Sequence, residues 1–299
     1  MSSILTNTSA MTALQTLAST NKALEQTQNR IATGLRINEA SDNASYWSIA
    51  SSMKSDNKAN SAVQDALGLG AGKVDTAYTG INDIKTQIES MKELLVSAQG
   101  ASQEDQQKIA TQIKGIQEQI KSSATNATYA GTNLLLNDGS ANADLKIVSS
   151  YNRTGNSVTV DTIDIASADT RVFGKNADGT IDTTQGFAAG VVDTAFFDPS
   201  TAALDDAAIK SAMDTVETAL SSLTTGAANL GAAKSRIDTQ SGFLSKLSDS
   251  IDKGVGALID ADMNKESARL SALQVQQQLG VQALSIANSS SQNILSLFR

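Results

Sequence analysis

The chain has no cysteine and no histidine, and these two absences exclude most of the chemistry that proteins perform with side chains. Without cysteine there is no thiol nucleophile, no thiolate metal site and no disulfide. Without histidine the commonest general base and imidazole metal ligand are missing as well. We therefore expect no enzymatic activity, no catalytic or cofactor-binding residues, no metal and no cofactor.

Proline and aromatic residues are scarce. The 299 residues include one proline, Pro199, and 4% aromatic side chains. A chain poor in aromatics packs thin helical seams better than a broad globular core. Because proline is the residue that most often breaks helices, long uninterrupted helices are possible here. The composition favours a mainly α fold.

Positive charge is in the minority, with 23 basic against 31 acidic side chains and a net charge of −8. No run of lysine and arginine is present, which argues against binding to nucleic acid. No window approaches 18 apolar residues, so we expect no insertion into a membrane. The first residues lack the features of a cleaved secretory signal. Secretion would therefore leave the N-terminus intact.

Heptad spacing marks both ends of the chain. The N-terminal stripe is spaced 4,3,4,3,4,3,4 and runs through Ala10, Leu14, Leu17, Asn21, Leu24, Gln28, Ile31 and Leu35. The C-terminal stripe is spaced 3,4,3,4,3,4,3,4 and runs through Leu270, Leu273, Gln277, Gly280, Leu284, Ala287, Ser291, Ile294 and Phe298. We expect the two helices to pack together as a coiled coil. One paired stripe buries little apolar area against the entropy of ordering, so we expect order only within a polymer.

Helical periodicity also fills most of the interior. We expect a helix that begins with Ser41 or Asp42 as its N-cap. On the return side, Asp198-Pro199 is a helix-start signal, and residues from Ala203 to about Ile259 read as one long helix with a possible break at Thr225-Gly226. The predicted segments are an N-terminal coiled-coil helix (1–40), a helical wall in two halves (41–140 and 200–262), an outer insert (141–199) and a C-terminal coiled-coil helix (263–299).

The insert differs from its surroundings in composition. Asp, Thr and Gly dominate it, and Asn137-Asp138-Gly139 and Asp178-Gly179 are turn signals. Residues 145–148 and 158–165 have the β-branched alternation of strands. The sequence predicts a long antiparallel helical hairpin with a small β-rich insert at its tip.

Two local motifs suggest ligand sites but fit them poorly. Gly68-Leu69-Gly70-Ala71-Gly72-Lys73 lacks the spacing of a phosphate-binding loop, and no Ser or Thr follows the lysine. Residues 176–182 resemble part of a calcium loop but lack its bidentate glutamate. A helix-packing role for the glycines and a solvated turn at 176–182 explain these residues better.

Motifs at both ends resemble those of bacterial flagellins. Residues 31–44, Ile-Ala-Thr-Gly-Leu-Arg-Ile-Asn-Glu-Ala-Ser-Asp-Asn-Ala, are similar to the N-terminal signature of that family. The C-terminal counterparts are Ile259-Asp260-Ala261-Asp262-Met263, Gln276–Gly280 and Gln292–Arg299. Residues 64–68 are similar to those of short alphaproteobacterial flagellins.

The resemblance implies a subunit of the helical flagellar filament, the propeller of swimming bacteria. It implies type III export to the cell exterior, polymerisation beneath a cap, and an inner tube built from both end helices. The residues implied to line that tube are Leu14, Leu17, Leu24, Ile31, Leu270, Leu273, Leu284, Ala287, Ile294 and Phe298. Implied partners are further copies, other flagellins, the cap, junction proteins and an export chaperone. The alternative is a hook–filament junction protein, but the motifs favour flagellin.

The resemblance also marks a connector between the end helix and the wall. Its residues are Arg36, Ile37, Asn38, Asp42, Tyr46 and Trp47. We expect Tyr46 and Trp47 to be an aromatic anchor in this connector. Ser41 and Ser90 replace a lysine and an arginine that are typical where innate immune receptors recognise flagellins, which counts against such recognition.

Overall fold

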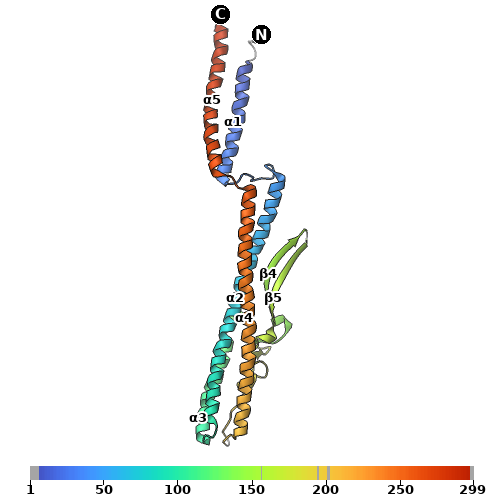
Figure 1. Ribbon diagram of the computed structural model, residues 1–299, viewed down its shortest axis with the longest axis vertical. Coiled ribbons are helices and arrows are strands. Elements are labelled where there is room, and N and C mark those ends of the chain that lie inside the picture. Colours follow the sequence, from blue (N-terminus) through green and yellow to red (C-terminus); the bar gives the residue numbers. More distant parts are fainter. Residues whose placement is uncertain (1–6, 156, 194, 201–202, 297–299) are drawn as a thin grey trace. The chain divides into compact units, whose positions relative to one another are not determined.

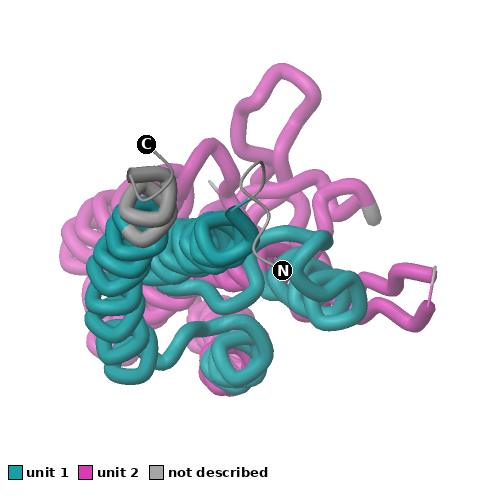
Figure 2. The backbone as a smooth tube through the Cα atoms, turned by 90° about the horizontal axis from the view of Figure 1, so that it is seen from above, with its two compact units in different colours: residues 1–57, 249–299 teal, residues 58–248 magenta. Residues whose placement is uncertain are grey.

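The computed structural model describes residues 7–155, 157–193, 195–200 and 203–296, with the side chains of all but residues 141 and 290–296. Its α-helices are α1 (Thr8–Thr33), α2 (Ala44–Ala98), α3 (Gln103–Asn126), α4 (Asp206–Ile259) and α5 (Met263–Ser296) (Figure 1). The chain divides into a terminal unit, residues 1–57 with 249–299, and a central unit, residues 58–248 (Figure 2). The mainly helical prediction is confirmed, whereas the five-segment division stays a prediction.

Helix α2 is 55 residues long because no proline interrupts it. Its N-cap was predicted wrongly at Ser41 or Asp42. The side-chain Oδ1 of Asn43 accepts a hydrogen bond from the backbone N–H of Tyr46 at 3.1 Å, so the helix begins at Ala44. Asparagine is as good a cap as serine or aspartate, and Asp42 has another role described below.

Helix α4, 54 residues long, also begins later than expected. The Oδ1 atom of Asp205 accepts from the backbone N–H of Ala208 at 2.8 Å and caps a helix that starts at Asp206, three residues after the expected Ala203, so Asp198-Pro199 does not start it; its end at Ile259 is as expected. Gly226 lies within the helix and does not break it. Local capping chemistry, which several nearby residues could supply, decided both helix starts.

The central unit encloses an apolar core between α2, α3 and α4. One face of α2 is fully buried there, at Leu67, Val74, Ile81, Ile84, Ile88, Met91 and Leu95. Helix α4 runs antiparallel to α2, as the ion pairs Asp75–Lys234 and Lys92–Glu217 show. Helix α3 folds back on α2, because its Ser123 lies within hydrogen-bond distance of Gln87. This core is a closed helical bundle.

The segment between α3 and α4 contains the strands. These are β1 (Thr128–Tyr129), β2 (Thr132–Asn133), β3 (Leu136–Asn137), β4 (Leu145–Thr154), β5 (Ser157–Ile165), β6 (Phe173–Lys175) and β7 (Ile181–Asp182), with 3₁₀ turns η1 (Ala141–Ala143), η2 (Ser167–Asp169) and η3 (Ala189–Val191). Strands β4 and β5 form an antiparallel hairpin with a bulge after Val148, and β6 lies between β3 and β7. The predicted strands are confirmed.

The insert lies along the side of the helices instead of at their tip. A Cβ atom on Gly70 of α2 would approach Ile147 Cδ1 to 2.6 Å, and one on Gly80 would approach Leu135 Cδ1 to 2.8 Å. Both glycines are in the middle of α2, whose C-terminal end is at Ala98. The glycines allow the insert to pack directly on the helix backbone.

Candidate functional site

Helices α1 and α5 lie side by side as an antiparallel pair in the terminal unit, which confirms the expected pairing of the two ends (Figure 1). Polar contacts fix their register. The Nδ2 atom of Asn7 donates to the carbonyl oxygen of Ala287 at 3.0 Å. Further along, Nε2 of Gln277 donates to Oδ1 of Asn21 at 2.8 Å.

The face that α5 turns toward α1 follows the predicted stripe. Buried and half-buried side chains recur at Glu266, Leu270, Leu273, Gln277, Gly280, Leu284 and Ala287. Close approach is possible at Gly280, where a Cβ atom would lie 3.2 Å from Leu17 Cδ1. The side chain of Ile294 and the whole of Phe298 lie outside the described residues.

The corresponding face of α1 differs from the predicted one at every second position. Its buried and half-buried side chains include Ala13, Leu17, Thr20, Leu24, Thr27 and Ile31. Leu14 was expected on this face but is 56% exposed, and Asn21 and Gln28 are exposed as well. Threonine is tolerated inside because its hydroxyl can bond to its own helix; Oγ1 of Thr20 donates to the carbonyl of Thr16 at 2.9 Å.

The seam between the two helices is therefore thin. Among the described side chains of α1 and α5, the buried ones are Thr20, Thr27, Glu266 and Leu273. Only Leu273 is aliphatic, whereas apolar burial is the main source of packing free energy. The pair is held in register by polar contacts more than by a core.

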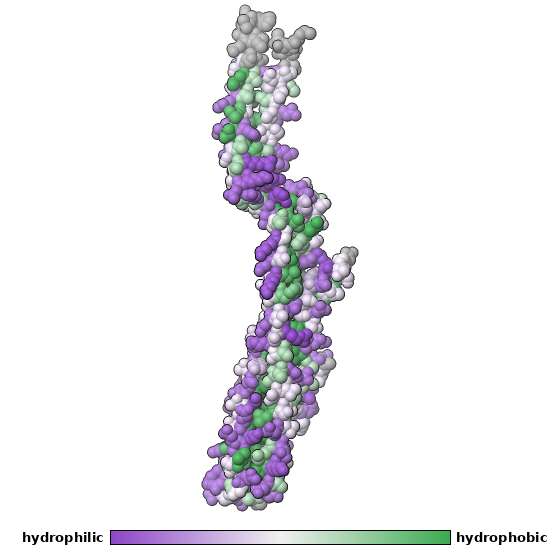
Figure 3. Space-filling view, viewed as in Figure 1, coloured by the Kyte–Doolittle hydropathy of each residue, from purple (hydrophilic) through white to green (hydrophobic). Residues whose placement is uncertain are grey.

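A second stripe on α5 faces away from α1. It consists of Ala268, Ala272, Val275, Leu279, Gln282 and Ile286, spaced 4,3,4,3,4, and all six are exposed. Val275, Leu279 and Ile286 are 54%, 58% and 69% exposed. Figure 3 shows apolar residues reaching the surface along α5. We call this set the outward stripe.

The distal parts of the pair also carry no charged side chain. Residues 1–21 and 270–298 contain no Asp, Glu, Lys or Arg. The terminal unit as a whole has eight basic and nine acidic side chains, whereas the central unit has fifteen and twenty-two. Exposed apolar side chains on an uncharged helix are characteristic of a surface that another protein covers.

The connector after α1 is held by backbone contacts to the end of α4. Gly34 ends α1 in the left-handed conformation, with φ of 72°. The N–H groups of Arg36 and Ile37 donate to the carbonyl oxygen of Ile259, at 2.6 and 3.2 Å. Ile37 is 6% exposed and packs with Ala50 and Ile259. Two of the predicted connector residues thus fix the chain path.

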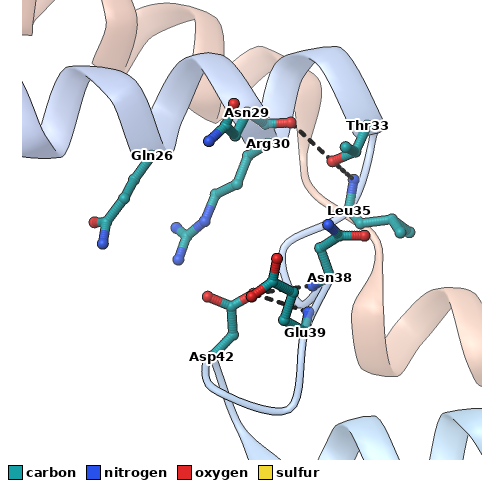
Figure 4. A pocket seen from close by; sticks show the side chains of 8 residues that line it. All are labelled: Gln26, Asn29, Arg30, Thr33, Leu35, Asn38, Glu39 and Asp42. Carbon is teal, nitrogen blue, oxygen red and sulfur yellow. Dashed lines mark hydrogen bonds between the residues drawn. The ribbon is translucent and has the colours of Figure 1, made fainter.

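Asp42 stabilises the loop of the connector (Figure 4). Its Oδ2 atom accepts from the backbone N–H groups of Asn38 at 3.0 Å and Glu39 at 3.3 Å. These two bonds, with the nearby positive charge of Arg30, hold the pKa of the Asp42 carboxyl below its ordinary value. The loop and α1 line a polar pocket of about 150 Å³ into which Arg30 extends.

Arg30 also links α1 to α5. Its Nη1 atom lies 3.4 Å from Oε1 of Glu266, whose side chain is only 9% exposed. The Oε2 atom of Glu266 is buried and has no hydrogen-bond partner within the described part of the chain. This pair was not predicted from the sequence. The spacing could have indicated it, because Glu266 lies four residues before Leu270 and so continues the C-terminal stripe toward α1.

Tyr46 and Trp47 do not anchor the connector, contrary to expectation. Both lie in the first turn of α2 and are 44% and 41% exposed. Ile49, one turn of chain further, is 50% exposed. The connector ends before the two rings, because α2 begins at Ala44. With Ile49 they leave three apolar side chains exposed in the first turns of α2, here called the aromatic patch.

The described residues contain neither a cluster of metal-ligating side chains nor a membrane-spanning helix. No group of three or more Asp or Glu side chains there is arranged to hold a metal ion. No described helix is both long and apolar enough to span a membrane.

Family models match most of the chain. The bacterial flagellin N-terminal helical region matches residues 4–140, and the bacterial flagellin C-terminal helical region matches residues 213–298. The chain belongs to the bacterial flagellin family. Flagellins are the structural subunits of the flagellar filament, the extracellular part of the flagellum, and they polymerise with themselves and with other flagellins.

Individual flagellins are similar over their full length. The flagellin of Brucella melitensis is 66% identical over 299 residues, with all of both chains covered. Flagellin C and flagellin B of Rhizobium meliloti are 43% and 42% identical over alignments of 325 and 397 positions, again with both chains fully covered. The N-terminal family region includes α1 and the connector, and the C-terminal family region includes α5.

Proposed function

We propose that this flagellin polymerises through the α1–α5 pair, with the outward stripe of α5 covered by neighbouring copies in the filament. The observation that carries the proposal is the charge-free distal pair with half-exposed Val275, Leu279 and Ile286 on its surface. We further propose that Leu14, which points away from the intrachain seam, contacts neighbours, and that the seam residues line the inner tube.

Desolvation energetics support this surface. Burying an unpaired charge at an interface is expensive, and residues 1–21 and 270–298 have no charged side chain to bury. Covering the remaining half of a valine, leucine or isoleucine contributes roughly 1 kcal/mol per side chain. Small gains of this kind add over the length of the helix pair and over many subunits. In the isolated chain the thin seam buries little apolar surface, so contacts with neighbouring copies would supply most of the apolar burial that stabilises the α1–α5 pair.

The family also supports finer proposals about the life of the chain. We infer that it is secreted by the flagellar type III route with a chaperone, and that it assembles beneath a cap, above junction proteins. A thin α1–α5 seam favours this route because the ends can unfold with little loss of packing. Its role is structural, without enzymatic activity. Weak recognition by innate immune receptors stays a prediction.

The test is a variant that changes only the outward stripe. Val275→Gln, Leu279→Gln and Ile286→Gln are introduced together into the full chain. Because the three side chains are exposed, the helical content of the monomer by circular dichroism should equal that of the wild type. Negative-stain imaging and sedimentation under salting-out conditions should then show filaments for the wild type and none for the variant.

A matched control separates this surface from a general loss of apolar surface. Val96 of the central unit is 53% exposed, so Val96→Gln removes a similar side chain elsewhere and should leave polymerisation intact. A chain of residues 41–262 should also fail to polymerise. If the triple variant forms filaments as readily as the wild type, the outward stripe is not the contact surface.

The aromatic patch offers an independent signal. Trp47 is the single tryptophan of the chain and is 41% exposed. If neighbouring copies cover the terminal unit, its fluorescence emission should shift to shorter wavelength on polymerisation and become less accessible to acrylamide. Trp47→Phe is the control that shows the signal belongs to this residue. An unchanged spectrum in filaments would leave the patch outside the subunit contacts.

A further inference from the structure

The insert and α2 border an open hollow of about 1150 Å³ in the central unit. Lysines enter it from three separate parts of the fold, Lys73 from α2, Lys146 from β4 and Lys175 from β6. We propose that this hollow binds an acidic polysaccharide chain, whose carboxylate groups pair with the three ammonium groups. We call it the lysine basin.

The three lysines border one hollow and have no carboxylate partner among the described residues. Five lysines of the central helices are paired with acids, namely Lys85, Lys92, Lys108, Lys121 and Lys234, whereas Lys114, Lys210 and Lys246 form no ion pair in the described part of the chain and lie outside the hollow. Within the described residues, Lys73, Lys146 and Lys175 make no ion pair, although Asp164 lies opposite Lys146 across the hairpin. Acidic side chains outnumber basic ones in this unit, so what distinguishes these three lysines is that they border the same hollow.

The acids that border the basin are already engaged. Oδ1 of Asp138 accepts from the backbone N–H of Ser140 at 3.0 Å and from its hydroxyl at 2.8 Å. Oδ1 of Asp144 accepts from the backbone N–H of Ser167 at 2.8 Å. These hydrogen bonds hold the two carboxylates in the loops of the basin wall, and among the described residues neither carboxylate forms an ion pair with Lys73, Lys146 or Lys175.

Uncharged groups complete the recognition surface. Asn142 and Thr132 line the basin, and in the described part of the structure their side chains make no hydrogen bond. An amide and a hydroxyl of this kind are suited to the hydroxyls of a sugar. The sugar ring would therefore bind at these groups while its carboxylate contacts a lysine.

The size of the basin favours a chain over a compact anion. Sites for single small molecules usually measure about 300–1000 Å³ and enclose the ligand, whereas this one is larger and open. Lysine is a point charge on a flexible stem, which suits repeated and loosely placed carboxylates better than one fixed phosphate. Exposed ion pairs are individually weak. On the proposed function, a filament presents many basins, and a long polysaccharide could engage several at once.

The test compares two lysine triples in the full chain. One variant carries Lys73→Gln, Lys146→Gln and Lys175→Gln; the control carries Lys114→Gln, Lys210→Gln and Lys246→Gln, which are exposed lysines outside the basin with the same change in charge. Binding to polygalacturonate is measured by calorimetry on monomers at low and high salt. Neutral dextran and inorganic phosphate are the comparison ligands.

We expect the wild type and the control to bind polygalacturonate, salt to weaken that binding, and the basin variant to bind about tenfold more weakly. Dextran should not bind. Absence of binding by the wild type, or equal loss in both triples, overturns the proposal. So does competition by phosphate at equal charge, which would indicate a compact anion site.

Filament assembly of the same variants separates this proposal from the proposed function. The basin variant should polymerise like the wild type, and the outward-stripe variant should bind polygalacturonate as a monomer although it forms no filaments. A basin variant that loses filaments but keeps polysaccharide binding would show that the lysines contact a neighbouring copy, and the proposal would be wrong.

Discussion

The central and terminal units use similar helices but bury very different side chains. In the central unit, α2 places Ile81, Ile84 and Ile88 at zero exposure. Among the described side chains of the terminal unit, the buried ones of α1 are two threonines, and those of α5 are Glu266 and Leu273. The central unit has its core within one chain, whereas the terminal helices leave apolar surface for other copies.

Charge differs between the units in the same sense. The central unit carries most of the excess of acidic over basic side chains, and ion pairs such as Lys85–Glu89 and Lys121–Glu118 lie on its exposed helix faces. The distal terminal helices have no charge at all. A charged face stays solvated, whereas an uncharged one can be dehydrated cheaply. The charged faces of the central unit are therefore suited to remain in solvent, whereas the uncharged faces of the distal terminal helices are suited to contact another protein.

The largest expected effect comes from comparing one apolar truncation in each unit. Ile88→Ala should lower the free energy of unfolding of the monomer by about 2–5 kcal/mol, because a fully buried side chain leaves a cavity. Leu24→Ala in the half-buried α1 seam should lower it by less than about 1 kcal/mol but slow polymerisation. Urea unfolding followed by circular dichroism measures both. Equal losses would mean that the terminal seam is as well packed as the core.

The Arg30–Glu266 pair tests how the thin seam is held. Arg30→Gln leaves the nearly buried Glu266 carboxylate without its cation and should destabilise the α1–α5 pair by about 1–3 kcal/mol. Glu266→Gln should cost less, since it leaves a half-buried arginine that water still reaches instead of a nearly buried carboxylate. Hydrogen exchange in the first turns of α5 measures the difference. The double variant should recover part of the loss; additive effects would show that the two side chains are not coupled.

Two glycines of α2 test whether the insert needs close contact with the helix. Gly70→Ala places a Cβ within 3 Å of three Ile147 side-chain atoms and should destabilise the central unit by roughly 1–2 kcal/mol. Gly68 has nothing within 4 Å, so Gly68→Ala should instead stabilise it by about 0.5–1 kcal/mol through helix propensity. Thermal unfolding distinguishes them. A stabilising Gly70→Ala would mean that Ile147 moves aside without cost.

The smallest expected effect is the pH dependence of the connector. Because the folded-state pKa of Asp42 is lowered, its contribution is complete above the unfolded value of 3.8 and is lost as the pH falls through the lower folded value. Protection of the Asn38 and Glu39 amides against hydrogen exchange should decrease as the pH falls through the folded-state pKa of Asp42. Asp42→Asn should show weaker protection that no longer changes over this range. If the variant titrates like the wild type, Asp42 is not the controlling group.

Sequence reasoning performed best where one periodicity decided the outcome. The α5 stripe from Leu270 to Ala287 lies on the face expected from its spacing, and the hairpin strands formed where alternation predicted them. Prediction from the sequence was wrong where two neighbouring residues could both cap a helix or both occupy its buried face. Asn43 and Asp205 cap helices in place of equally suitable neighbours, and Thr20 and Thr27 occupy positions that were given to Asn21 and Gln28.

The sequence by itself determined that this flagellin is helical, paired at its ends and without thiol or imidazole chemistry, because spacing and composition are local properties of the chain. Only the tertiary structure decided which side of each helix is left uncovered, since a face becomes a surface only after its neighbours are placed. The outward stripe is regularly spaced in the sequence, but only the placement of α1 shows that it is exposed, and the Arg30–Glu266 contact and the lysine basin join residues that are distant in sequence. Packing between elements created them.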